Sequence, residues 1–485
     1  MSSHKTKSRW RLLALLATFT LLTAACVSND DSADTTTTDD TAADEPAADD
    51  TAAAAADTAA DDTAADDTAA DEPEPEPEPI VLTDSWRGVT ADTITLGMTM
   101  LDFAELTGLG LSPAGWGDQQ AVWEALIADL NDRGGINGRM VEGIYDFYSA
   151  LDPTDAERSC ALLTQDNEIF ANLGGFVGPA GTADPCIPGT NETIMIGGEI
   201  TGDELDGVTV PWFHTAPTGD FQTRSLLNLL EQTGRADGAK VFTMGGAAAA
   251  DEEQGVLDEL DARGIEVVGS AIIEATDGDT VAQDQELEVA FERFKSSGAT
   301  ALMIFGTPSA SIRGAGAAGL SGTIDIWSND SGGLANLGAT IIDKSIADGV
   351  LTTTGATDDE IWESPEFQSQ CVDPVVARVA DADLRLPTSY EADQENWFNP
   401  LRRYCHVLSI FEQIATAAGG DLTPTTFGDA AYGPAFDDFQ IPGVGPASLS
   451  PDKRGASDGL RLSEYDSTLG DGGLSPVTEL LDAYQ

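Results

Sequence analysis

Between Asp92 and Trp327 the sequence alternates short apolar runs with longer amphipathic stretches, and this alternation restricts the fold more than any other feature. The first half predicts strands at 93–98, 140–146, 169–177 and 193–196, separated by helices at 118–133, 154–166 and, less regularly around two prolines, 183–191. Strands and helices that alternate in this way form a parallel sheet covered by helices.

A second series of the same kind follows Pro211. It predicts helices at 221–233, 252–263, 285–297 and 309–320, and strands at 240–244, 266–273, 301–305 and 324–327. Two such series predict an α/β fold of two doubly wound, Rossmann-like lobes joined by a hinge. Ligands of these sheets bind beyond the carboxyl ends of the strands, so the cleft between the lobes is the expected site.

The charge of the chain excludes one class of partner. Its 485 residues include 84 acidic and 23 basic ones, which give a formal charge of −61. Proteins bind nucleic acids through Lys and Arg side chains that neutralise phosphates, so we expect no nucleic-acid partner.

The first 26 residues have the layout of a bacterial export signal. Basic residues up to Arg11 precede an apolar run from Leu12 to Leu22 and the small residues before Cys26. A run of about eleven apolar residues is too short to span a bilayer as a helix. The stretch ending at Cys26 resembles a lipobox, although Leu22 stands four residues before the cysteine instead of three. It predicts a lipid anchor on the outer face of the cytoplasmic membrane; the alternative is secretion after cleavage at Ala25.

Residues 27–80 are predicted to form a disordered acidic linker. Repeats of the Asp-Asp-Thr-Ala-Ala type lead into alternating Glu and Pro, and the segment 27–79 contains 19 acidic and no basic residues. Like charges repel one another and Glu-Pro repeats favour the polyproline II conformation, so this segment is an extended spacer.

Four further cysteines follow the linker: Cys160, Cys186, Cys371 and Cys405. An even number in an exported chain predicts disulfides. Of the three possible pairings we favour Cys160 with Cys186 and Cys371 with Cys405, because each closes a short loop. Neither the cysteine spacings nor the three scattered histidines predict a metal site.

The sequence offers little for catalysis or for a cofactor. The run from Gly314 to Gly319 fits the pattern G-x-G-x-x-G, but it lies inside a predicted Ala-rich helix instead of at a strand-to-helix turn, so we expect close helix packing. Motifs for a nucleophile elbow, a Walker A loop and a zinc protease are all missing from the sequence. We therefore expect no enzyme and no cofactor.

One set of short motifs carries a family resemblance. Asn-Asp-Arg-Gly-Gly-Ile-Asn-Gly-Arg at 131–139 is followed by Asp146 and by Asp-Pro-Thr-Asp-Ala at 152–156, then by Phe-Val-Gly-Pro at 176–179, Met-Ile-Gly-Gly at 195–198 and Ser-Ser-Gly-Ala at 296–299. In this order they resemble the solute-binding proteins of branched-chain amino acid ABC transporters, of the Leu/Ile/Val-binding type. The resemblance covers residues 92–327 well and the C-terminal part loosely.

The resemblance implies the type I periplasmic-binding fold and a monomer that captures a small polar solute, such as an amino acid or amide, between two lobes. The lobes close on a hinge and deliver the solute to a membrane permease. We expect the first lobe at 92–217 plus 354–440 and the second at 218–353 plus 441–485.

The resemblance also assigns site residues by position. The loop after the third strand offers Gly178, Ala180, Gly181 and Thr182 to the ligand's carboxylate, the loop after the fourth offers Glu199 and Thr201, and the second lobe offers Thr307, Ser309 and Asp330, the last for the ammonium. Thr182 could instead cap a helix, Thr201 begin a turn and Asp330 be an ordinary loop residue.

Some features leave the solute open. The second lobe lacks the aromatic residues that enclose the ligand in this family, although Trp116 or Trp327 could supply an apolar wall. Glu199 could meet a cationic group, so a basic or amide solute is also consistent with the sequence. Two rival functions are a ligand-sensing surface lipoprotein without a transporter and an enzyme that acts in the cleft.

Overall fold

The computed structural model describes residues 80–484 apart from 199, 201–204, 206, 276–279, 307, 336, 338–340, 342, 392 and 470–471. The predicted export signal, Cys26 and the linker up to residue 79 lie outside the described residues. Within the described part, no helix combines the length and the apolar character needed to cross a membrane.

The first sheet contains five parallel strands in the order β2-β1-β3-β4-β5. Its strands are β1 (Thr93–Leu101), β2 (Met140–Tyr148), β3 (Ala171–Leu173), β4 (Ile194–Ile196) and β5 (Trp212–Phe213). In the register of β1, Leu96 lies between Gly143 of β2 and Ala171 of β3. The connecting helices include α2 (Phe103–Gly108), α3 (Gln119–Asp132) and α4 (Pro153–Ala161).

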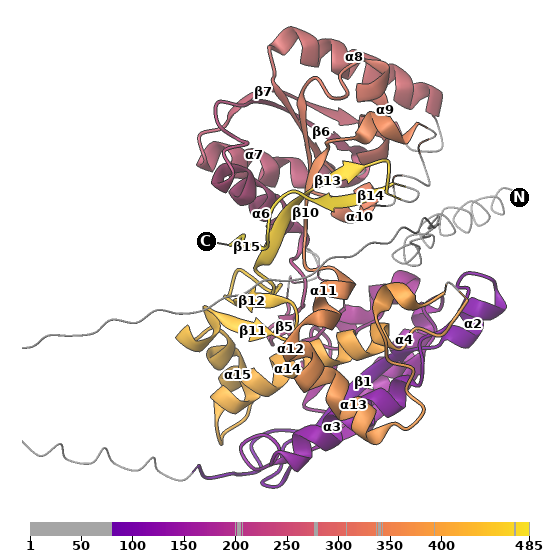
Figure 1. Cartoon of the computed structure of the whole chain (residues 1–485). Coiled ribbons are helices and arrows are strands. Elements are labelled where there is room, and N and C mark those ends of the chain that lie inside the picture. Colours follow the sequence, from indigo (N-terminus) through magenta and orange to yellow (C-terminus); the bar gives the residue numbers. More distant parts are fainter. Residues whose placement is uncertain are drawn as a thin grey trace, which may run out of the picture. The chain divides into compact units, whose positions relative to one another are not determined.

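The second sheet contains eight strands, and the path through seven of them is β14-β13-β10-β9-β8-β6-β7. The parallel strands are β6 (Lys240–Gly246), β7 (Glu266–Ile273), β8 (Ala301–Phe305), β9 (Asp325–Ser328) and β10 (Leu351–Thr354). The C-terminal segment adds β13 (Gly459–Asp466), β14 (Gly473–Pro476) and β15 (Leu481–Asp482) in antiparallel pairing. Figure 1 shows β13 and β14, in yellow, beside the orange β10.

The helices of the second lobe occupy the connections between its parallel strands. They are α7 (Glu253–Ala262), α8 (Thr280–Ser297), α9 (Pro308–Ala317) and α10 (Ser331–Ala335), while α6 (Gly219–Gln232) precedes β6. Gly314 lies within α9, and a Cβ atom there would come within 2.6 Å of the Phe291 ring on α8. The expectation of close helix packing at this glycine run is therefore confirmed.

Residues 358–447 pack on the first sheet. They form α11 (Asp358–Glu363), α12 (Pro365–Phe367), α13 (Asp373–Arg378), α14 (Phe398–Ala418), α15 (Pro424–Ala431), β11 (Phe439–Ile441) and β12 (Gly445–Ala447). Apolar side chains of α14 share one buried core with those of β1, β3 and α3. In Figure 1 the orange α14 lies among the indigo elements from the start of the folded chain.

The predicted disulfides are both present, Cys160 with Cys186 and Cys371 with Cys405. The second of them joins α14 to the π-helical turn at Gln368–Val372. It therefore fixes the long helix to the segment that precedes it.

Two elements expected in the first lobe differ from the structure. The third strand is shorter than 169–177 because it ends before Gly174, whose φ of 103° breaks the extended backbone. A 3-10 helix at Gly178–Cys186 replaces the helix expected at 183–191, because Pro185 has no N–H group to continue an α-helix. Within this region the predicted elements are otherwise present, with shifted ends.

The expected return to the second lobe at residue 441 does not match the packing. Ile441, Ala447, Leu449 and Ala456 are buried in the same core cluster as β1. The hairpin of β11 and β12 carries these apolar residues into the first lobe, and β13 begins only at Gly459.

The motif at 131–139 has a structural role in this chain. The side chain of Arg139 is fully buried, and its guanidinium donates hydrogen bonds to the carbonyl oxygens of Thr90, Thr83 and Gly420 at 2.7, 2.9 and 2.7 Å. It ties the segment before β1 and the loop after α14 to the start of β2.

An ion pair joins two of the segments that cross between the lobes. Arg461 on β13 contacts the carboxylate of Glu360 on α11, with a hydrogen bond of 3.0 Å from Nη1 to Oε1, and it also donates to the carbonyl oxygen of Gly355. The hydrogen bonds from Arg461 lower the pKa of Glu360 to about 2. Glu360 also completes a capping box with Thr357 at the start of α11.

We predict that the stabilising effect of Glu360 depends on pH. Because the folded-state pKa of about 2 lies below the ordinary value of 4.5, the ion pair stabilises the fold above pH 4.5, and this contribution is lost as the pH falls toward 2. Glu360→Gln keeps the capping box, so it should lower the urea midpoint at pH 7 and much less at pH 3. Glu363→Gln, an exposed change in the same helix, is the control; equal effects of Glu360→Gln at both pH values would contradict the prediction.

Candidate ligand-binding site

The carboxyl ends of the first sheet's strands carry polar and aromatic side chains. The loop after β1 contains Trp116, Ser149 follows β2, and His214 follows β5. Because the strands are parallel, these loops emerge at the same edge of the sheet. We take this edge as the first half of the candidate site.

Arg403, in the first turns of α14, reaches the same edge. Its guanidinium carbon lies 5.2 Å from the ring centroid of Trp116, and the Trp116 ring lies 5.0 Å from that of Phe103. The side chain of Arg403 is exposed, yet removal of surrounding water lowers its pKa to about 10.

His214 lies close enough to Arg403 for the guanidinium charge to affect its pKa. Its Nδ1 accepts a hydrogen bond of 3.0 Å from the backbone N–H of Ala216. Burial lowers the pKa of His214, and the positive charge of Arg403 lowers it further, against the opposing effect of the backbone contact with Ala216. With its pKa lowered, the imidazole is neutral at pH 7, and its Nδ1 also lies 3.1 Å from the carbonyl oxygen of Ala216.

The second half of the candidate site lies at the carboxyl ends of β8 and β9. Ser309 is half-buried in the first turn of α9, and Asp330 is half-buried at the start of α10. Burial raises the pKa of Asp330, although its Oδ1 accepts a hydrogen bond of 2.7 Å from the N–H of Gly333. The preceding Asn329 is held by a hydrogen bond of 2.9 Å to the hydroxyl of Thr223 on α6.

The loop assigned to the carboxylate by resemblance is largely occupied with its own contacts. The N–H of Ala180 donates to the carbonyl oxygen of Ala150 at 3.1 Å. The hydroxyl of Thr182 is exposed and donates to the carbonyl oxygen of Pro179 at 3.0 Å. Gly178 begins this turn with a φ of 62°, and Gly181 is buried. Of the four expected residues, Ala180 therefore has no free N–H to offer a ligand.

Three expected site residues, Glu199, Thr201 and Thr307, lie outside the described residues. The two tryptophans considered as apolar walls are placed differently. Trp327 is fully buried in the core beneath the second sheet, whereas Trp116 is half-buried at the candidate site. Only Trp116 is available to a ligand.

Sequence reasoning missed Arg403. The available signal was the adjacent pair Arg402 and Arg403 near the start of an otherwise apolar stretch, in a chain with few basic residues. In the structure Arg402 pairs with Asp358 at 3.3 Å, and its neighbour is left facing the site.

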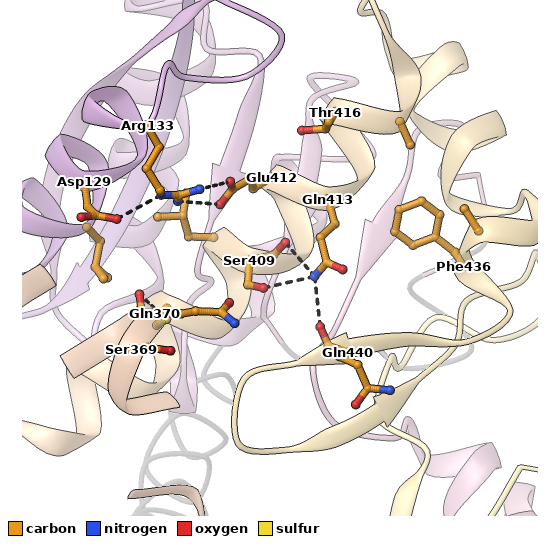
Figure 2. Close-up of a pocket in the computed structure, with 15 residues that line it drawn as sticks. Asp129, Arg133, Ser369, Gln370, Ser409, Glu412, Gln413, Thr416, Phe436 and Gln440 are labelled. Atoms are coloured by element: carbon orange, nitrogen blue, oxygen red, sulfur yellow. Dashed lines mark hydrogen bonds and ion pairs between the residues drawn. The ribbon is translucent and has the colours of Figure 1, made fainter. Parts of the chain in front are cut away.

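A cavity of about 710 Å³ lies elsewhere, between α3, the turn at Gln368–Val372, α14 and β11. Figure 2 shows Arg133 held between Asp129 and Glu412 there, and the amide nitrogen of Gln413 bonded to Ser409 and Gln440. The charged groups Asp129, Arg133 and Glu412 therefore pair with one another inside this cavity.

Comparison with known proteins gives matches to structures only. No protein-family model and no curated protein matches the chain. An ABC transporter substrate-binding protein from Desulfitobacterium hafniense matches with a TM-score of 0.52 at 12% identity, over 80% of this chain and 100% of the other. A putative branched-chain amino acid ABC transporter protein from Rhodospirillum rubrum matches with a TM-score of 0.51 at 16% identity, over 79% and 100%. The fold is that of ABC transporter substrate-binding proteins.

A third match has a bound solute in its description. A substrate-binding protein from D. hafniense in complex with Leu is 14% identical, with a TM-score of 0.50 over 80% of this chain and 100% of the other. The predicted class of two doubly wound α/β lobes is confirmed by these substrate-binding folds and by the two sheets.

We predict that the His214 imidazole reports the charge of Arg403. In NMR titrations it should ionise below its ordinary pKa of 6.5, and Arg403→Gln should raise that pKa because one repelling charge is gone. Arg235→Gln, an exposed change in the second lobe, is the control and should leave the titration unchanged. An unchanged His214 pKa in Arg403→Gln would place the guanidinium away from the imidazole.

Proposed function

We propose that this protein is the extracytoplasmic solute-binding receptor of an ABC importer. The observation that carries the proposal is the pair of sheets in the substrate-binding fold. Trp116, with Arg403 of α14 against it, follows a strand of one lobe, and Asp330 and Ser309 follow strands of the other. A solute that contacts both lobes favours a closed form through its higher affinity for that form, and the closed form would dock on the permease.

The proposed solute is an amino acid or a related small polar compound. The half-buried carboxylate of Asp330 suits an ammonium group, because a bound cation would offset the burial that raises its pKa. Gly178, Gly181, Thr182 and Ser309 remain proposed contacts, together with the undescribed Glu199, Thr201 and Thr307. The role of Ala180 is limited to its side chain.

We further propose that lipidation of Cys26 anchors the protein, as a monomer, outside the cytoplasmic membrane, with residues 27–80 as a spacer. The first lobe would comprise residues 92–217 and 354 to about 457, and the second lobe the remainder of the folded part. The two lobes bind and release the solute without changing it.

We predict that a cognate solute stabilises the purified protein. At a free concentration one hundred times its Kd, a single-site ligand adds about 2.7 kcal/mol to the free energy of unfolding, which corresponds to a rise of roughly 3 °C in the melting temperature if about 400 folded residues unfold together. The measurement is thermal melting against amino acids, their amides and short carboxylates. If every one of these compounds left the melting temperature unchanged, the proposed receptor function for small polar solutes would be contradicted.

We predict that Asp330→Asn weakens binding of zwitterionic solutes by about tenfold or more, because a charge-assisted hydrogen bond to the ammonium is lost. The unliganded protein should change by less than about 1 kcal/mol, since Asn also caps a helix. Calorimetric titration checks the affinity, with Asp325→Asn, an exposed change at the other end of β9, as the control. Equal affinities of Asp330→Asn and the control would remove Asp330 from the site.

A further inference from the structure

Arg403 is a cation without an anionic partner. In the part of the chain that the structure describes, its guanidinium has no hydrogen bond and no ion pair, and its recorded contact is with the face of Trp116. Asp358, whose charge acts on Arg403, pairs instead with Arg402. An exposed guanidinium without a counterion is free to pair with an anion from outside.

The structure holds Arg403 firmly in this position. The next residue, Tyr404, is buried, stacks on Trp123 at 4.4 Å and donates a hydrogen bond of 2.6 Å to Oε1 of Gln119. Gln119 in turn bonds both backbone groups of Leu101 at the end of β1. Cys405 adds the disulfide to Cys371. The contacts of Tyr404 and Cys405 therefore fix the position and rotation of this part of α14, and with it the position of Arg403.

The surroundings of Arg403 favour one kind of anion. The guanidinium carbon of Arg403 lies over the Trp116 ring, and among the described residues the guanidinium N–H groups have no hydrogen-bond partner. The edge of a guanidinium matches the two oxygens of a carboxylate in a bidentate pair. Trp116 and Phe103, both half-buried, form an apolar surface directly beside this position.

We infer that Arg403, held against Trp116, binds the carboxylate of the transported solute, whose apolar part lies against Trp116 and Phe103. This inference rests on the proposed function and narrows the solute to organic carboxylates. It moves the carboxylate away from the loop at 178–182, where the N–H of Ala180 is already bonded to Ala150.

The test compares carboxylates with their uncharged or cationic amides on the full protein. L-Leucine and benzoate, each at 10 mM, are set against leucinamide and benzamide within a broader panel of such pairs, and binding is measured by melting and by calorimetry. We expect at least one carboxylate to bind and its amide to bind about 30-fold or more weakly. In Arg403→Gln this difference in affinity between carboxylate and amide should disappear. Arg402→Gln, which removes the neighbouring charge, should keep the preference.

Arg403→Gln should also fold normally. Its melting temperature without solute should stay close to that of the parent protein, because the exposed guanidinium makes no hydrogen bond or ion pair with the described residues; a purely structural arginine would lower it. Arg403→Lys should restore part of the carboxylate affinity, since Lys keeps the charge but not the bidentate geometry.

The outcomes separate this inference from the proposed function. Binding of amides alone, or carboxylate binding that survives Arg403→Gln, would overturn the inference and leave the receptor function standing. Failure of all compounds in both sets to bind would overturn both.

Discussion

In each sheet the core strands run parallel, and this pairing places the loops that follow them at a single edge. Residues far apart in the sequence, such as Trp116 and His214, lie at that edge because the strands that precede them run in the same direction. The helix α14 then adds Arg403 from nearly two hundred residues further along. The candidate site depends on this convergence more than on any single motif.

The segments that cross between the lobes are held by buried polar contacts. Lys453 is almost fully buried, its ammonium donates to the carbonyl oxygens of Ser448, Gly455 and Ala456, and it pairs with Asp458 at 2.9 Å. Backbone bonds from His214 to Arg454 and from Ala456 to His214 join the first crossing to the third. These contacts hold the first and third crossing segments side by side.

Much of the fold was predictable from local signals. Hydrophobic period and capping residues such as Asp118 and Asp152 mark the helices and strands, and loop length favoured the correct disulfide pairing. The motif at 131–139 indicated the fold but serves packing, through Arg139. The last crossing between the lobes was predicted at residue 441, but the chain crosses later. The apolar residues of the hairpin around Ile441 could be buried in the core of either lobe, and only tertiary contacts decide which core they join.

The site was harder to predict, because a free group and a satisfied one look alike in a sequence. No local sequence signal shows that the N–H of Ala180 is already hydrogen-bonded, or that Arg402 pairs with Asp358 while Arg403 has no such partner.

Hydrogen–deuterium exchange, with and without a solute that raises the melting temperature, tests the central claim most directly. The account predicts slower exchange in peptides from the strand ends of both lobes, including those with Trp116 and Asp330. Protection confined to one lobe, or to the cavity between α3 and α14, would contradict it.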